Sequence, residues 1–338
     1  MDTYSTTRYP YLGSTGLVPS RLVNPDFSWE KTRKLEGGLE LGFLRNQLLV
    51  SANYYYNRSS NQLVGYALPV ITGQPSIQFN FPATLQNNGW ELEAGFNPVT
   101  SKGFSWSSWL NITIPRNKLV SFPGIESSSY NTTYQVGAPL SVYMAYHNLG
   151  VDPQTGMYTF TDENRDGSPD LLALKKIAQE FYGGFQNSFK YGGLELDFLF
   201  QFVRQSGRNY RYAGFGMPGT IGNQPTVVLD RWQKPGQLTT IQKFSQDYAS
   251  DAAMADLNDL SSDHIVSDAS FIRLKNLSFT CKLPPSWLRK MKGQSFRLFL
   301  LGQNLWTLTR YQGLDPENQN ATALPPLRVI TLGLHATF

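Results

Sequence analysis

The C-terminal segment of this chain alternates apolar and polar or small side chains and ends on an aromatic residue. Ile330, Leu332, Leu334, Ala336 and Phe338 fall on one face of an extended strand, and the intervening residues fall on the other. An alternating segment of about ten residues that ends on Phe is typical of the closing strand of an outer-membrane β-barrel. The pattern therefore predicts an all-β fold in a membrane, with Phe338 as the closure and assembly signal.

Eight further segments alternate with period two, which is the spacing of a strand with two different faces. In the clearest of them Leu194, Leu196 and Phe198 oppose Glu195 and Asp197. Together with the C-terminal strand these segments make nine strands, whereas a bacterial outer-membrane barrel has an even number. We therefore expect the chain to supply the C-terminal portion of a larger antiparallel barrel. The nine predicted strands lie near residues 34–44, 47–57, 88–98, 103–115, 180–190, 193–204, 268–282, 294–308 and 327–338.

The predicted connections alternate between short turns and long loops. Outer-membrane barrels place short turns in the periplasm and long loops outside the cell. If the chain ends in the periplasm, every short turn between the predicted strands falls on that side. The long loops, predicted to be extracellular, then cover residues 57–86, 116–178, 205–266 and 309–326.

Composition agrees with a barrel. Charged residues make up 16% of the chain, against roughly 25% in soluble domains, and aromatic residues make up 14%. There is no apolar run of about 18 residues, the length that a membrane-spanning helix requires. The net charge of +4 comes without a Lys/Arg block, so nucleic-acid binding has little support.

Two alternatives to a membrane barrel also produce alternation, a soluble β-sandwich and a β-propeller. A propeller predicts a repeat of about 40–50 residues, which the sequence lacks. Loops as long as those predicted here are also uncommon in compact soluble domains. The N-terminus has neither the basic region nor the apolar region of a signal peptide, so we expect the chain to be part of a longer polypeptide.

Six motifs in order resemble those of one transporter family, SusC/RagA, the TonB-linked (TonB-dependent) outer-membrane transporters of Bacteroidetes. The most specific is the sequence SDASFIRLKN at 267–276. The six motifs lie at residues 24–32, 87–93, 182–188, 267–276, 302–305 and 313–317. The chain departs from the family pattern at residues 177–180, before the motif at 182–188.

The resemblance implies a barrel of about 22 strands closed by an N-terminal plug. It implies energised import of large nutrients, either glycans or peptides, with a SusD-like surface lipoprotein as lid. Plug, early strands and the TonB contact would belong to an N-terminal part that this chain lacks, and outer-membrane lipid would surround the wall.

A segment rich in oxygen ligands lies at residues 162–170. It places these ligands at positions 1, 3, 5 and 9 and Gly at position 6, as at the start of a calcium loop, but Ala173 occupies the position of the bidentate Glu. One interpretation is Ca²⁺ that orders an extracellular loop; the other is an Asp/Asn/Gly turn without metal. The candidate ligands are Asp162, Asn164, Asp166, Ser168 and Asp170.

The long loops carry aromatic side chains that suit contacts with a glycan, a peptide or a partner protein. They equally suit small cores that keep long loops ordered. The residues singled out for ligand or partner contact are Tyr130, Tyr134, Tyr146, Tyr210, Tyr212 and Trp232.

Support for catalysis is thin. The three histidines, His147, His264 and His335, have no zinc-type spacing. Cys281 lies within a predicted strand, and no nucleophile elbow occurs. The leading hypothesis is therefore the barrel portion of an importer and not an enzyme. The alternatives are a surface scaffold that docks a lid or substrate without transport and, with less support, an outer-membrane enzyme.

Overall fold

The computed structural model describes residues 3–9, 12–20, 22, 24–68, 71, 76–101, 103–171, 173–290 and 294–337. It forms two compact units. The first contains the chain up to Gly37 together with Tyr55–Asn88 and Arg116–Leu140, and the second contains the rest. No helix in the described ranges is long and apolar enough to cross a membrane.

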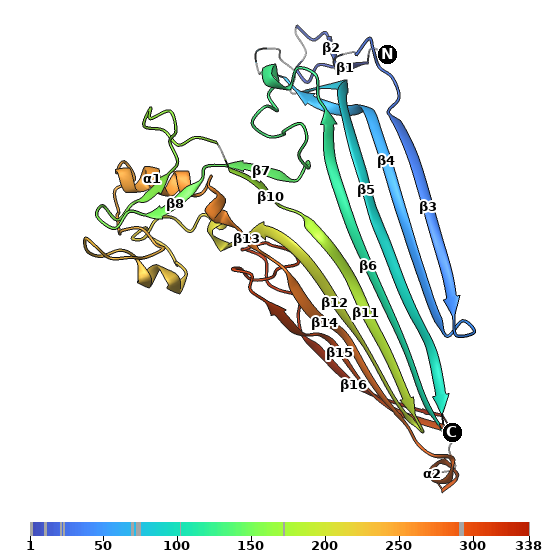
Figure 1. Cartoon of the computed structure of the whole chain (residues 1–338). Helices are drawn as coiled ribbons and strands as arrows, with labels where there is room; N and C mark the ends of the chain where they lie inside the picture. Colours follow the sequence, from blue (N-terminus) through green and yellow to red (C-terminus); the bar gives the residue numbers. More distant parts are fainter. Residues whose placement is uncertain are drawn as a thin grey trace. The chain divides into compact units, whose positions relative to one another are not determined.

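A ten-stranded sheet dominates the fold (Figure 1). Its order is β16-β15-β14-β12-β11-β6-β5-β4-β3, with β13 pairing β12 off this path. The pairs from β6 to β16 are antiparallel, and long strands that are neighbours in the chain are neighbours in the sheet. The strands are β3 (Lys31–Phe43), β4 (Leu48–Ala67), β5 (Ser76–Ser101), β6 (Phe104–Ser121), β11 (Gln179–Tyr191), β12 (Leu194–Arg208), β13 (Val266–Asp268), β14 (Phe271–Lys282), β15 (Ser295–Thr309) and β16 (Val329–Thr337).

The nine long strands correspond to the nine predicted segments, and the predicted fold class is confirmed. One face of β16 shows why: Ile330, Leu332 and Leu334 are 70%, 77% and 57% exposed. Such an apolar face, with polar side chains opposite, suits lipid outside and water inside a barrel. Phe338, the predicted closure signal, lies outside the described residues.

The predicted loop 57–86 is wrong, because most of it is strand. β4 continues to Ala67 and β5 begins at Ser76. Polar hydrogen bonds stabilise this extension where apolar alternation fades: Asn61 Nδ2 donates to Trp29 O at 3.0 Å, and Asn80 Nδ2 donates to Ser28 O at 2.7 Å. The predicted loop 116–178 also starts late, since β6 runs to Ser121.

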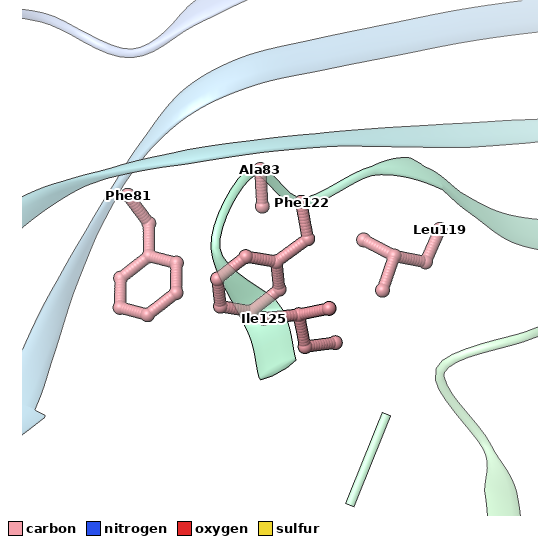
Figure 2. Packing of buried hydrophobic residues seen from close by; sticks show 5 residues of the cluster. All are labelled: Phe81, Ala83, Leu119, Phe122 and Ile125. Atoms are coloured by element: carbon pink, nitrogen blue, oxygen red, sulfur yellow. The ribbon is translucent and has the colours of Figure 1, made fainter. Parts of the chain in front are cut away.

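The first unit has its own small core beside η2 (Ile125–Ser127), shown in Figure 2. Phe81, Ala83, Leu119, Phe122 and Ile125 form it, and the rings of Phe81 and Phe122 meet edge-on at 4.8 Å. The same unit contains a small sheet of β1 (Tyr4–Thr6) and β2 (Leu17–Pro19).

Two segments of the second unit, residues 141–178 and 205–266, fold together at one end of β11 and β12, and we call them the loop assembly (Figure 1). Helix α2 (Pro285–Lys290) lies at the other end, between β14 and β15. Within the loop assembly β7 pairs with β10 and β8 with β9. Its elements are β7 (Val142–Ala145), β8 (Asn148–Val151), β9 (Tyr158–Phe160), β10 (Ala173–Lys176), η3 (Tyr210–Ala213), η4 (Thr226–Asp230), α1 (Asp251–Asp259) and η5 (Asp263–Ile265).

Candidate functional site

A buried carboxylate connects four elements of the loop assembly. Asp259, at the end of α1, is 2% exposed. It accepts hydrogen bonds from Asn148 Nδ2 in β8 at 2.5 Å, Arg211 Nη1 in η3 at 3.2 Å and His264 Nδ1 in η5 at 2.9 Å. A buried charge is tolerated only when it is paired and hydrogen-bonded, so this network fixes the relative positions of the four elements.

A small cavity of about 40 Å³ lies beside this network. Tyr158, Tyr210, Arg211 and Asp256 line it together with apolar side chains. Burial, with the charge of Asp259, raises the pKa of Asp256 to about 6 against the attraction of Arg211. Burial also raises the pKa of Tyr158 to about 12. The volume suits a few water molecules and is too small for a sugar or peptide.

A second carboxylate, Asp263, joins β10 to η5. It accepts hydrogen bonds from His147 Nδ1 at 2.8 Å and the Asn148 amide at 3.0 Å, and Lys175 Nζ lies at 3.1 Å. Burial raises the pKa of Asp263, but these hydrogen bonds outweigh burial and hold that pKa below its ordinary value. Two of the three histidines, His147 and His264, are therefore hydrogen-bond partners of carboxylates within the loop assembly.

The motifs at 267–276 and 313–317 meet on the polar face of the sheet. Arg273 in β14 is 3% exposed, and its Nη2 donates to both carboxylate oxygens of Asp315, which is 1% exposed, at 3.1 and 3.0 Å. Arg273 Nη1 also donates to Glu317 Oε2 at 2.6 Å. The loop after β15 is thus held on this wall. Both motifs are recognisable in the sequence, but the pairing of Arg273 with Asp315 and Glu317 was not predicted from it. The opposite charges of the two motifs could have indicated this pairing.

In the predicted calcium loop, backbone N–H groups donate to the Asp and Asn side chains of the same loop, as in an Asp/Asn turn. One buried oxygen, Asp162 Oδ1, has no partner. Among the described residues, no group of three or more His, Cys, Asp or Glu side chains is arranged to hold a metal. Calcium binding stays a prediction. The backbone donors to Asp162, Asn164, Asp166 and Asp170 are Gly167, Asp166, Ser168 and Glu163, at 3.0, 2.9, 2.8 and 2.7 Å.

Three of the six selected aromatic residues pack inside the loops. Tyr130 and Tyr134 stack at 5.9 Å against the core of the first unit. The Trp232 indole donates to Pro153 O at 3.0 Å and covers Gly156, where a Cβ would overlap the ring. These side chains stabilise the loops.

The other three aromatics, Tyr146, Tyr210 and Tyr212, lie in the loop assembly, as Trp232 does. Tyr146 packs edge-on against Phe160 at 6.3 Å, and Tyr210 lines the small cavity. Tyr212 is different, because it is 50% exposed and its ring lies 3.9 Å from the Arg208 guanidinium carbon. Of the six, Tyr212 has the geometry that best suits contact with a ligand.

Comparisons with known proteins agree on one family. Residues 2–170 match the family model "TonB dependent receptor-like, beta-barrel". TonB-dependent receptor P3 of Formosa agariphila is 26% identical over 96% of this chain and 36% of its own length. TonB-dependent receptor SusC of Bacteroides thetaiotaomicron is 26% identical over 98% and 34%. The chain thus spans about a third of the length of these relatives, which are receptors and not enzymes.

Solved structures agree in fold. The structure titled "Structure of the RagAB peptide transporter" superimposes with a TM-score of 0.79 at 24% identity, over 100% of this chain and 38% of that chain. The RagAB peptide importer in the 'closed-closed' state gives a TM-score of 0.78 with the same identity and coverage. At this identity the likeness supports the fold alone.

Proposed function

Because this chain belongs to the TonB-dependent receptor-like β-barrel family of the outer membrane, we propose that it forms wall strands and extracellular loops of an importer of large nutrients. The observation that carries the proposal is the sheet of long strands, with an apolar exposed face on β16 and the loop assembly at one end of β11 and β12. The cargo class is oligosaccharides or oligopeptides. The rest of the barrel and the plug, through which TonB acts, come from an N-terminal part of the same transporter.

The partner we propose is a SusD-like surface lipoprotein that docks on the loop assembly. Two carboxylates, the buried Asp259 and the half-buried Asp263, hold the elements of the loop assembly together, and a rigid surface loses little conformational entropy when it binds. In this arrangement the loop assembly is extracellular. Helix α2 and the end of β16 are periplasmic, as is the C-terminus.

Uptake by intact cells tests the proposal. Deleting the gene should abolish import of one class of fluorescent oligosaccharide or oligopeptide, and a protonophore should do the same in wild-type cells. Unchanged uptake of both classes in the deletion strain would refute import. Surface binding that survives the protonophore while uptake never occurs would instead indicate the scaffold function. Cleavage of the oligomer by the purified protein would indicate an enzyme.

A further inference from the structure

Arg208, the last residue of β12, lies between two tyrosine rings at the base of the loop assembly. Its guanidinium carbon is 3.9 Å from the centre of the Tyr212 ring and 5.5 Å from that of Tyr143. Aromatic faces attract a guanidinium through the ring quadrupole and leave the edges of its plane free for hydrogen bonds. The two tyrosines therefore orient the donors of Arg208 without using them.

The donors of Arg208 take no acceptor among the described residues. Nε is buried and has no hydrogen-bond partner. Arg208 as a whole is partly exposed to solvent, and no described residue accepts a hydrogen bond from its terminal nitrogens. A buried donor without an acceptor is unfavourable, which marks Arg208 as a side chain held without an intramolecular hydrogen-bond partner.

Three other arginines of the second unit behave differently, because each already has a carboxylate partner. Arg204 pairs with Asp268 at 3.3 Å, Arg211 with Asp259 at 3.2 Å and Arg273 with Asp315 at 3.0 Å. The charge of Arg208 is thus the unneutralised one in this set. Arginine in a fixed plane is suited to bidentate recognition of a carboxylate.

The backbone around Arg208 is held on both sides. The Tyr311 hydroxyl donates to Arg208 O at 2.5 Å, and the Asn209 amide donates to Ile265 O at 2.7 Å. Asn209 Nδ2 also donates to His264 O at 2.8 Å. A group held in this way loses little entropy when it binds a ligand, which is the condition for a preorganised subsite.

We propose that Arg208, held between Tyr143 and Tyr212, is a subsite for a carboxylate carried by the imported oligomer. This inference rests on the proposed function and narrows its substrate class. The carboxylate comes from one of two sources, the C-terminus of a peptide or a uronic acid of a glycan. In both cases the carboxylate accepts from the guanidinium edge, and the exposed Tyr212 ring covers the adjoining apolar part of the ligand.

The test measures binding to the protein purified from outer membranes in detergent. The probes are tetra-alanine and its C-terminal amide, and trigalacturonate and its methyl ester. Wild type should bind the acid form of one pair at least tenfold more tightly than its neutral form. Arg208→Gln should remove that preference, because hydrogen bonds to a charged group contribute about 1.5–3 kcal/mol, or roughly 10- to 100-fold in affinity.

Two further variants control for charge and folding. Lys234→Gln removes one positive charge from an exposed loop position and should leave the preference unchanged. Tyr212→Leu keeps the charge of Arg208 but removes the ring, and should weaken binding of the acid form several-fold. This variant provides the test if Arg208→Gln does not fold. The proposal is overturned if wild type shows no acid preference, or if neither Arg208→Gln nor Tyr212→Leu reduces it. Uptake of neutral oligomers by cells that carry Arg208→Gln would support the proposed import function separately from the subsite, which the binding measurements test.

Discussion

The Arg273–Asp315 pair yields the sharpest stability prediction. Asp315 is 1% exposed and receives two hydrogen bonds from Arg273 and one, at 2.7 Å, from the Glu317 amide. Removing one partner of a buried ion pair costs about 3–5 kcal/mol, because the other charge stays buried. Glu317 remains 2.6 Å from Arg273, so for Asp315→Ala we expect the lower end, about 3 kcal/mol of unfolding free energy.

The assay is denaturant unfolding of the protein in detergent, combined with a double-mutant cycle. Arg273→Met removes the buried positive charge. In that background Asp315→Ala should lower the free energy of unfolding by at least about 1 kcal/mol less than it does in wild type, which lies within the range of about 0.5–3 kcal/mol for coupled residues. Lys275→Met is the matched control, since Lys275 is 33% exposed and surface pairs contribute about 0–1 kcal/mol. Costs of Asp315→Ala and Arg273→Met that add within about 0.5 kcal/mol would refute the coupling.

Three further predictions concern the loops and the core of the first unit. Burial raises the pKa of Asp256 to about 6, above its ordinary 3.8, so the stability that its protonated form contributes is present below pH 4 and is lost as pH rises through 6. Asp256→Asn should therefore raise the thermal midpoint of unfolding at pH 7.5 and change it little at pH 4. An equal shift of the midpoint at both pH values would contradict this. Leu119→Ala, at a position 2% exposed, should lower unfolding free energy by about 2–5 kcal/mol, measured by denaturant unfolding; a loss under about 1 kcal/mol would contradict the packing shown in Figure 2. Calcium, if it binds Asp162 and its neighbours, should slow proteolysis between residues 160 and 171 relative to EDTA, with Asp162→Asn abolishing the effect; identical digestion rates would rule out the metal.

The strands were predictable because their environment imposes a period of two. Leu196, Phe198 and Phe200 face one way along β12, and their partners Phe279, Leu277 and Leu274 continue the same face on β14. Lipid on one side and water on the other produce this pattern directly in the sequence. Prediction failed over 57–86, where Asn61 and Asn80 replace apolar alternation with side-chain hydrogen bonds.

The candidate site was less predictable, because loop contacts join residues far apart in sequence without a period. Trp232 and Tyr212 are both aromatic residues of one predicted loop, and the sequence does not distinguish their roles. In the structure Trp232 covers Gly156, whereas Tyr212 is half exposed beside Arg208. Asp259 and Asn148 meet because α1 packs against β9, which pairs with β8. Residue type predicted which side chains suit binding, and tertiary structure decided which were still available for it.

The two features that sequence reasoning missed, the pair Arg273–Asp315 and the exposed edge of Arg208, are connected through one loop. Arg273 holds Asp315 to the wall, and Gln205 Nε2 donates to Pro316 O at 2.7 Å. Four residues before Asp315, Tyr311 fixes the carbonyl of Arg208. Disrupting the buried pair should therefore loosen the proposed carboxylate subsite without touching it. Asp315→Ala is expected to reduce the acid preference of the probes, whereas Lys275→Met is not. An unchanged preference in Asp315→Ala would show that Arg208 is positioned by the loop assembly alone.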